Sequence, residues 1–486
     1  MSSIKKNFAL NTINTVSALL FPLITFPYTS RILLADGIGQ IAFFQSIISY
    51  ISLFSALGLP LYAIREIARV RDNNEKCSKT AIEIIILHAF LTLLGYIVVF
   101  ILCITVTKIK ADILLFLILS TSLFFTAIGA TWFYQGIEDF KYITIRALVV
   151  RTVSLICLFL FVHEKSDLLI YATITVVAEV GGNIFNFVRL NNFVDKKYLF
   201  NFKELSFLKH LKPALKIFIL NLTISIYVNL DSVMLGFLGS EQAVGYYAAS
   251  TRLTKAILAV VSSLGTVLLP RFSNLIEHNR MEEFRVMAQK AINLVLALSI
   301  PLTVGLAILA GPIIRLFSGT SFEPAILTLQ LISPILLMIA LSGILGMHML
   351  YPQGKESLVI ISTTIGAVLN FSLNMFTIPH YAQYGAAFST TIAESCVTIS
   401  MIIIGHKYLP VNFFTKQTCV CVIGTILISI VLLCICRYTN LNDFLIVLIG
   451  SSLSICIYFF VLLLGKNSLA MEMLSLLTNI KRRLVH

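Results

Sequence analysis

The chain has 486 residues, of which 58% are hydrophobic and 12% are charged, and its formal net charge is +13. Soluble domains carry about 25% charged residues, so this composition excludes an ordinary soluble protein. A basic balance can also mark a nucleic-acid-binding protein, but no loop between the apolar segments is long enough to form a soluble basic face. We therefore expect a membrane protein that does not bind nucleic acid.

About fourteen apolar segments follow one another, each near the length of about 20 residues that crosses a bilayer. In chain order they cover Phe8–Leu34, Ile38–Ile64, Thr80–Val106, Ile113–Phe133, Ile143–Val162, Leu168–Leu190, Pro213–Leu238, Val244–Leu269, Phe284–Ala310, Ala325–Tyr351, Leu358–Ile378, Tyr384–Leu409, Gln417–Cys436 and Phe444–Leu464. This pattern predicts an all-α polytopic membrane protein with about 14 transmembrane helices.

Lysine and arginine lie mostly on one side of these segments. With the N-terminus inside, the cytoplasmic segments hold roughly 27 of the 36 Lys and Arg residues, and the outer loops hold about 6. This positive-inside bias predicts that both termini are cytoplasmic. The basic residues then face the anionic headgroups of the inner leaflet, which accounts for the net charge.

Three pairs of similar positions indicate an internal duplication with an offset of about 206 to 218 residues. The pairs are Gln135-Gly136-Ile137-Glu138 with Gln353-Gly354-Lys355-Glu356, Ala178-Glu179 with Ala393-Glu394, and Gly39 with Gly245. Two units of six spans share one orientation, which predicts two six-helix lobes around a central cavity. We assign residues 1–200 to the N-terminal lobe, 201–410 to the C-terminal lobe, and 411–486 to an additional helix pair with a cytoplasmic tail.

The sequence favours transport over catalysis. It contains no G-x-x-x-x-G-K-[ST] motif, so we expect no P-loop ATP hydrolysis. Cys419/Cys421 and Cys434/Cys436 are spaced i,i+2, so each pair points to opposite sides of a helix and cannot share a metal. We expect no cofactor, no metal site and no catalytic residues, and an energy source in an ion gradient, the membrane potential or the substrate's own gradient.

Ionisable residues inside the apolar segments are costly and are therefore candidates for function. Asp231 and Arg252 flank the predicted hairpin turn near Gly239–Gln242 at similar depth, and Lys255 follows Arg252 on the same helical face. Asp231 and Arg252 could form a purely structural ion pair. One acid facing two bases nevertheless leaves a surplus positive charge, which would suit an anion bound inside the protein.

Four further ionisable residues within the predicted spans are candidates. Arg151 in the fifth span and Arg31 at the end of the first either snorkel to their interfaces or add positive charge to the cavity. Glu179 and Glu394, near the predicted midplane, are either proton sites or satisfied structural acids.

Longer motifs resemble a known family and follow one another in its order. They are Phe21-Pro22-Leu23-Ile24-Thr25-Phe26-Pro27-Tyr28-Thr29-Ser30-Arg31-Ile32-Leu33, Gly58-Leu59-Pro60, Arg65-Glu66-Ile67-Ala68, Trp132-Phe133-Tyr134-Gln135-Gly136-Ile137-Glu138-Asp139, Asn229-Leu230-Asp231-Ser232-Val233-Met234-Leu235-Gly236, Val244-Gly245-Tyr246-Tyr247, Leu268-Leu269-Pro270-Arg271, Pro379-His380-Tyr381-Ala382-Gln383-Tyr384-Gly385-Ala386-Ala387 and Ala393-Glu394. Together they resemble the Wzx-type O-antigen and capsule repeat-unit flippases, which are polysaccharide transporters of the MOP exporter superfamily. The chain departs from the family at Leu34-Ala35-Asp36, where a glycine is more common.

The resemblance implies two lobes around a cationic cavity in the bacterial cytoplasmic membrane. It implies alternating-access transport of an undecaprenyl-pyrophosphate-linked oligosaccharide from the inner to the outer leaflet, coupled to H+ or Na+, with polysaccharide polymerase and assembly proteins as partners. Our charge analysis agrees, because surplus buried cations suit a pyrophosphate. We therefore expect substrate binding by Lys255, Arg252, Arg151 and Arg31, and ion coupling or ion pairing by Asp231, Glu179 and Glu394.

Two alternative functions remain open at this point. A multidrug/cation antiporter of the same superfamily would surround its cavity with acids, and a non-transporting membrane scaffold of polysaccharide assembly would flip no lipid. The cytoplasmic loop from Arg65 to Lys79 presents a further choice. Arg65 and Arg69 either only set the topology or also meet substrate headgroups before these reach the cavity.

Overall fold

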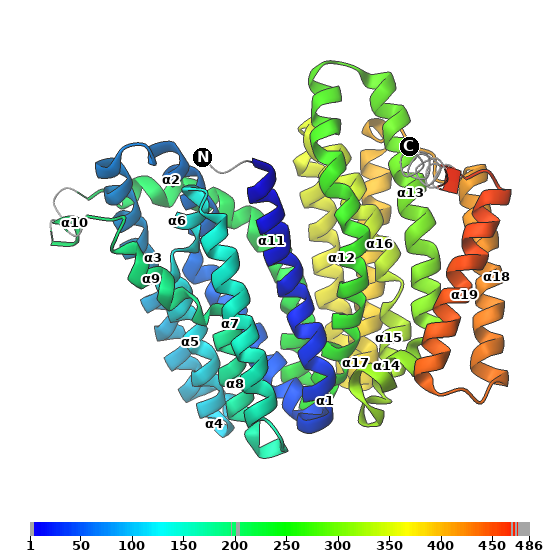
Figure 1. Ribbon diagram of the computed structural model, residues 1–486, viewed down its shortest axis with the longest axis horizontal. Helices are drawn as coiled ribbons and strands as arrows, with labels where there is room; N and C mark the ends of the chain where they lie inside the picture. The colour runs from blue at the N-terminus through cyan, green and yellow to red at the C-terminus, as the bar shows by residue number, and fades with distance from the viewer. Residues whose placement is uncertain (1–3, 196, 201–204, 468–469, 472–473, 475–486) are drawn as a thin grey trace, which may run out of the picture. The chain divides into compact units, whose positions relative to one another are not determined.

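The computed structural model describes residues 4–195, 197–200, 205–467, 470–471 and 474, and all regular secondary structure in these ranges is helical (Figure 1). Contacts divide the chain into two compact units, residues 1–236 and 237–486, which we call unit 1 and unit 2. The lobe boundaries that we placed at residues 200 and 410 stay predictions.

Each unit is a succession of helices with short connections. Unit 1 contains α1 (Ile4–Ala56), α2 (Leu59–Val70), α3 (Asn74–Thr105), α4 (Thr107–Ala111), α5 (Ile113–Gly129), α6 (Thr131–Gly136), α7 (Phe140–Phe161), η1 (Lys165–Asp167), α8 (Leu168–Val176), η2 (Val177–Gly181), α9 (Asn183–Leu190), α10 (Lys197–Phe200) and nearly all of α11 (Leu208–Leu238). Unit 2 contains α12 (Glu241–Glu277), α13 (Met281–Ile308), α14 (Ala310–Ser318), η4 (Thr320–Phe322), α15 (Ala325–Ile332), α16 (Ile335–Gly343), η5 (Ile344–Leu350), η6 (Tyr351–Gln353), α17 (Glu356–Gly405), η7 (His406–Tyr408), α18 (Lys416–Tyr438) and α19 (Asp443–Leu464).

The helices have the length and apolarity of membrane spans. Within the described residues, ten helical segments could cross a membrane, or up to eleven when the bent pair counts as one span. The 65-residue segment Lys6–Val70 covers the first two predicted spans, and the 53-residue segment Glu356–Tyr408 covers the eleventh and twelfth. Large apolar side chains such as Phe100 and Ile455 are exposed, as lipid contact requires. The chain is an all-α multi-pass membrane protein, and the predicted count of 14 spans is not confirmed.

The first helix is interrupted where the sequence departs from the resembling family. Leu34 has φ 58° and ψ −174°, which are not helical values, in the middle of α1. A positive φ brings a Cβ atom into steric conflict with the backbone, so glycine is the residue that fits such a position best. The break falls between the first and second predicted spans and gives each its own helical segment.

The helix of the second predicted span, Ile38–Ile64, turns near its end. α1 ends at Ala56, and Leu57 (φ 44°) and Gly58 (φ 74°) turn the chain into α2. A Cβ at Gly58 would lie 2.5 Å from the carbonyl oxygen of Ala214, so only glycine fits this turn. α2 is amphipathic, with one buried face and one charged face.

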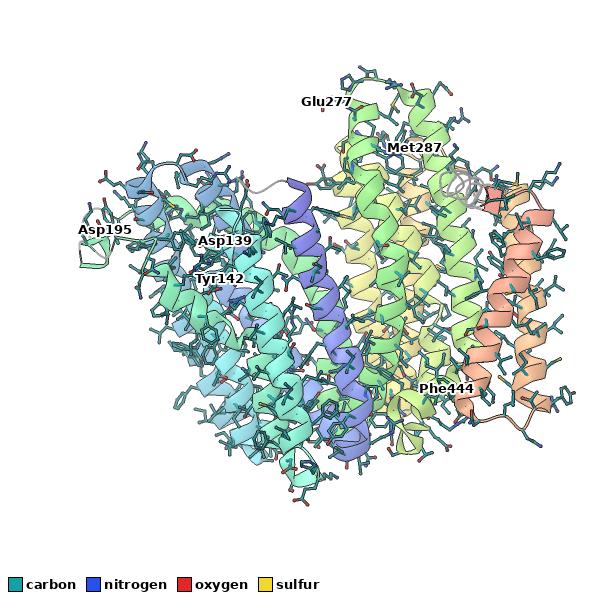
Figure 2. The ribbon with its side chains drawn as sticks, viewed as in Figure 1. Asp139, Tyr142, Asp195, Glu277, Met287 and Phe444 are labelled. Atoms are coloured by element: carbon teal, nitrogen blue, oxygen red, sulfur yellow. The ribbon has the colours of Figure 1, made fainter. Side chains whose placement is uncertain are left out.

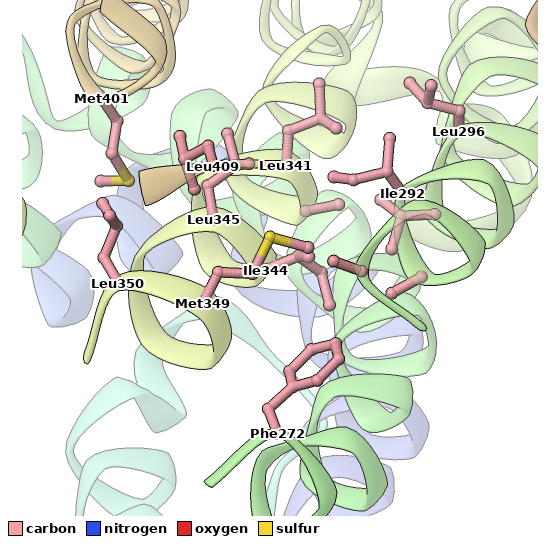
Figure 3. Close-up of a cluster of buried hydrophobic side chains, with 14 of the residues drawn as sticks. Phe272, Ile292, Leu296, Leu341, Ile344, Leu345, Met349, Leu350, Met401 and Leu409 are labelled. Carbon is pink, nitrogen blue, oxygen red and sulfur yellow. The ribbon is translucent and has the colours of Figure 1, made fainter. Parts of the chain in front are cut away.

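The main buried cluster of unit 2 joins α12, α13, α16, η5 and α17 (Figure 3). The π-helical segment η5 supplies four of its side chains, Ile344, Leu345, Met349 and Leu350. The cluster fixes the ends of these helices relative to one another, because interiors are close-packed and resist displacement.

The C-terminal helix pair packs against the rest of unit 2. α18 and α19 contact one another and α13, and the Tyr458 hydroxyl donates a hydrogen bond of 2.7 Å to the Ala297 carbonyl oxygen. At the other end of the pair, Arg315 of α14 forms two hydrogen bonds of 2.9 and 2.7 Å with the Asp443 carboxylate. Contacts at both ends therefore hold the pair in place.

The two ends of unit 2 can be told apart in Figure 2. Glu277 and Met287 lie at one end of the unit, and Phe444 lies at the opposite end. The charge pattern predicts that the first end is cytoplasmic, and we call the predicted cytoplasmic end of each unit its basic end. In unit 1 this end includes α2, α6 and the segment around Asp139 and Asp195 (Figures 1 and 2).

Candidate functional site

α12 carries two of the predicted substrate-binding cations. Its first turn is fixed by Ser240, whose hydroxyl oxygen accepts a hydrogen bond of 3.2 Å from the backbone N–H of Ala243. Arg252 is half-buried and Lys255 is exposed, whereas Thr254 between them is fully buried. The structure thus places both cations on a side of α12 that is not packed into the core of unit 2.

The acid that we expected to pair with Arg252 lies on the preceding helix. Asp231 of α11 is 4% exposed. It belongs to unit 1 and Arg252 belongs to unit 2, so their pairing stays a prediction.

The two arginines predicted in unit 1 contact helix backbones. The guanidinium of Arg151 donates to the Asn14 carbonyl oxygen (3.2 Å), to the Asn14 side-chain oxygen (3.0 Å) and to the Ser17 hydroxyl (2.5 Å), and so ties α7 to α1. Arg31 is exposed and donates to the carbonyl oxygen of Pro27 within its own helix. Each contact has a structural role, and the substrate-binding roles of both residues stay predictions.

The two acids at equivalent positions of the repeat lie in different surroundings. Glu179 is exposed and belongs to η2, a π-helical segment, whereas Glu394 in the second half of α17 is 6% exposed. Single π-helical turns leave a backbone carbonyl without its usual partner and are frequent at functional sites. At the end of η2 the guanidinium of Arg146 donates a 2.9 Å hydrogen bond to the Gly182 carbonyl oxygen. Our sequence analysis did not single out Arg146.

A buried carboxylate at the basic end of unit 1 also escaped the sequence analysis. Glu83 of α3 is 0% exposed and accepts hydrogen bonds from the backbone N–H of Ser206 (2.7 Å), from Lys209 Nζ (2.7 Å) and from His210 Nε2 (2.9 Å). The hydroxyl of Tyr62 in α2 contacts His210 Nδ1 at 2.8 Å. This Glu83 network joins α2, α3 and the start of α11.

His210 precedes the predicted seventh span, and burial lowers its pKa despite the nearby Glu83 carboxylate. A neutral imidazole donates from one ring nitrogen and accepts at the other, which matches a donor to Glu83 and an acceptor for Tyr62. One signal could have revealed the network. Glu83 interrupts an otherwise apolar run from Ala81 to Leu87, where an acid is costly unless it has partners.

The predicted first contact with substrate headgroups lies on α2. Arg65 and Arg69 are exposed, and both approach the same carboxylate oxygen of Glu66, at 3.3 and 3.1 Å. Exposed ion pairs of this kind contribute about 0–1 kcal/mol, so the guanidinium groups stay available to other anions. The structure brings the two cations together, and their contact with substrate stays a prediction.

Two hollows open at the basic end of unit 2. The larger, of about 700 Å³, lies between α13, the 409–412 connection and the first turn of α18. The smaller, of about 320 Å³, lies between α12 and α13. Basic and amide side chains line both hollows, and the sequence analysis assigned none of their residues to transport.

Comparison with known proteins places these features in a family context. The sequence profile described as "Polysaccharide biosynthesis protein" matches residues 4–276, and the profile described as MatE matches residues 217–376. A putative O-antigen transporter from Shigella dysenteriae is 24% identical over 82% of this chain and 99% of its own length. A second putative O-antigen transporter, from Escherichia coli strain K12, is 23% identical over 82% of this chain and 96% of its own length.

Solved structures share the fold. A lipid II flippase MurJ structure in an inward closed conformation has a TM-score of 0.67 at 17% identity and covers 94% of this chain and 99% of its own. An inward-facing multidrug resistance MATE family transporter of the MOP superfamily has a TM-score of 0.61 at 13% identity over 79% of this chain and 94% of its own. At these identities the likeness concerns the fold alone.

Proposed function

Because the chain belongs to the polysaccharide biosynthesis protein family, whose profile matches more than half of it, we propose that it is a flippase for lipid-linked oligosaccharides. Its substrate is an undecaprenyl-pyrophosphate-linked repeat unit, which it moves from the cytoplasmic to the outer leaflet of the bacterial inner membrane by alternating access. The chain is a membrane transporter and not an enzyme. The two putative O-antigen transporters that it resembles are matched over 99% and 96% of their own length.

The observation that carries the substrate class is the pair of cations on α12. Arg252 and Lys255 lie within an apolar helix and outside the packed core of unit 2. Cations at such a depth are costly in lipid, so a hydrated cavity suits them better. Two cations three residues apart on one helix favour an anionic group, and a pyrophosphate offers several oxygens to an ammonium and a guanidinium.

The proposal is tested by reconstituting the protein in vesicles and measuring the flipping of a labelled undecaprenyl-pyrophosphate-linked oligosaccharide. We expect Lys255→Ala to abolish flipping while the protein still inserts and folds. Lys255→Arg keeps the charge in another shape and should retain partial activity. Arg437→Ala, which removes an exposed cation from the last turn of α18, is the matched control and should leave flipping unchanged. Full flipping by Lys255→Ala would overturn the assignment of this residue.

Energy and partners follow from the same proposal. Coupling to H+ or Na+, or to the membrane potential, replaces ATP, and Glu179, Glu394 and Asp231 are the candidate coupling residues. Both termini lie in the cytoplasm according to the charge pattern. A polysaccharide polymerase and other assembly proteins would receive the flipped repeat unit.

One alternative has an observation in its favour. The MatE profile covers residues 217–376, and a MATE family transporter shares the fold, which favours a multidrug/cation antiporter. Such a protein would export organic cations and would leave the lipid-linked sugar in place. Cation efflux by vesicles that flip no lipid-linked oligosaccharide would select this alternative, and the absence of both activities would select the scaffold.

A further inference from the structure

The larger hollow at the basic end of unit 2 has the chemistry of an anion site. α13 lines it with Arg285, Gln289, Lys290 and Asn293, and the opposite wall contains Asn412 of the connection between α17 and α18. Lys290 also lines the smaller hollow on the other side of α13. The ammonium group of Lys290 can therefore contact a ligand in either hollow.

The amide groups of the larger hollow are oriented by the backbone. Gln289 accepts at its side-chain oxygen from the backbone N–H of Asn412 (2.7 Å), and its side-chain nitrogen donates to the carbonyl oxygen of Asn412 (2.8 Å). The same nitrogen donates to the side-chain oxygen of Asn293 (3.0 Å). The side-chain oxygen of Asn412 accepts from the backbone N–H of Phe414 (2.9 Å). Backbone groups therefore fix the orientation of the Gln289 and Asn412 amides. The Asn293 amide is then oriented by its hydrogen bond with Gln289.

In this arrangement the side-chain oxygens of Gln289, Asn293 and Asn412 all accept hydrogen bonds. Asn293 and Asn412 each have a side-chain NH2 group that makes no hydrogen bond within the described part of the chain. Asn293 is 8% exposed, so its NH2 group is held in a defined place at the wall of the hollow. A ligand in this position meets donors and must supply acceptors.

The charges point in the same direction. Among the described residues, neither Arg285 nor Lys290 forms an ion pair, and both line the hollow. The acid Glu283 of the smaller hollow is engaged at both oxygens by Arg280, at 2.6 Å each. Glu282 is the one acidic side chain among the residues that line the larger hollow. Two cations and two amide donors against one carboxylate favour a phosphate group.

Exposed apolar side chains at the hollow and next to it in sequence, which we call its rim, favour a lipid over a soluble phosphate as the ligand. Val286, which lines the hollow, is 57% exposed, and Phe414, two residues after the lining residue Asn412, is 92% exposed. Exposed aromatic and aliphatic side chains beside cations at the ends of spans are typical of the membrane interface. A free phosphate would gain nothing from this rim, whereas a glycerophospholipid would place its acyl chains against it.

We propose that the larger hollow binds the phosphate of an anionic glycerophospholipid from the leaflet at the basic end. Arg285 and Lys290 attract the phosphate, and the amides of Asn293 and Asn412 donate to its oxygens. This site is distinct from the proposed substrate cations. Lys255 precedes Arg271, a lining residue of the neighbouring smaller hollow, by about 24 Å of α12 at 1.5 Å per residue.

The test measures lipid retention by the full chain, purified in an uncharged detergent and stripped of lipid. Labelled phosphatidylglycerol and labelled phosphatidylcholine with the same acyl chains are titrated separately and compared. Arg285→Gln and Lys290→Gln remove exposed cations without changing the fold, and Asn293→Asp keeps the oxygen that Gln289 needs while removing the donor. Lys407→Gln removes an exposed cation at the same end that lines neither hollow, and it is the matched control.

We expect one phosphatidylglycerol to bind more tightly than phosphatidylcholine, and each of the three hollow variants to weaken it by about tenfold, since a charge-assisted hydrogen bond is lost. Lys407→Gln should bind like the unchanged protein. Equal binding by all variants, or equal retention of both lipids, would overturn the proposal. Inorganic phosphate that competes at the same concentration as the lipid would assign the hollow to a free anion and overturn the lipid assignment.

Discussion

Glu83 places a carboxylate within the third predicted membrane span, and other residues of unit 1 provide its hydrogen-bond donors. Lys79 lies four residues earlier on the same helix, but within the described residues it forms no ion pair with Glu83. The partners of Glu83 are Ser206, just before α11, and Lys209 and His210, in the first turn of α11. A buried carboxylate needs several donors, because its desolvation costs more than one hydrogen bond returns. The Glu83 network therefore ties the start of α11 to α3 and, through Tyr62, to α2.

Removal of this carboxylate should loosen the start of α11. We expect Glu83→Ala to destabilise the protein by about 2–4 kcal/mol, since several hydrogen bonds to a charged group are lost and the buried His210 loses its acceptor. Thermal unfolding in detergent and protease cleavage between residues 205 and 212 measure the effect. Glu75→Ala, on an exposed acid of the same helix that accepts one hydrogen bond from Tyr198, is the control and should cost far less. Equal losses in the two variants would contradict this account.

The two repeat-related acids give a second prediction at this scale. A coupling residue has to exchange protons during the cycle, and Glu179 on an exposed π-helical segment is better placed for this than the buried Glu394. We expect Glu179→Gln to change the pH dependence of flipping in reconstituted vesicles and Glu394→Gln to leave it unchanged. If neither variant changes the pH dependence, neither acid is the coupling site.

At the scale of helices, each half of the predicted repeat contains an irregular stretch before its Gln-Gly motif. α5 ends at Gly129 and a left-handed Ala130 (φ 38°) leads into α6, just before the Gln135-Gly136 motif. In unit 2 the π-helical η5 and the 3-10 helix η6 come just before Gly354, whose φ is 68°. Hydropathy alone predicts uninterrupted spans at Ala130 and at η5. A break in backbone geometry does not change the mean apolarity of a segment.

The packing of α18 and α19 leads to a prediction for these two helices. A Cβ at Gly424 in α18 would lie 2.9 Å from the ring of Tyr458, whose hydroxyl bonds to Ala297. We expect Gly424→Leu to push the helices apart and to cost about 1–3 kcal/mol. Protease resistance of the 411–467 region reports the change. Gly305→Leu is the matched control, since nothing lies within 4 Å of its Cβ position, and it should be tolerated. A Gly424→Leu protein as resistant as the control would contradict the packing.

For the whole molecule, the energetics of transport depend on charge moved across the membrane. A pyrophosphate with two negative charges that leaves a negative interior gains about 4–5 kcal/mol at 100 mV, from about 2.3 kcal/mol per charge. We expect flipping in vesicles to accelerate when the side from which the substrate leaves is made negative. The initial rate under clamped potentials of either sign measures the effect. Identical rates under both signs would indicate an electroneutral cycle, in which a counter-ion crosses with each substrate.

Sequence pattern alone identifies this chain as a helical multi-pass membrane protein. These properties are local or additive: about 20 apolar residues are enough to satisfy every backbone hydrogen bond of a span in lipid. The charge asymmetry likewise predicts orientation from the sum over loops, without any knowledge of packing. The sequence also located Arg252 and Lys255 on one helical face, since their spacing alone decides this.

Which charges have partners, and where the helices break, depends on tertiary packing. Arg151 contacts Asn14, and Glu83 contacts Lys209, across more than a hundred residues of sequence, and no local pattern encodes such pairs. Glu83, Arg146 and the turn at Gly58 therefore escaped the sequence-based predictions. The hollow beside Arg285 and Lys290 arises in the same way, because the connection after α17 returns to α13 and its backbone orients the Gln289 amide. Packing brought these groups together, and their chemistry follows from that proximity.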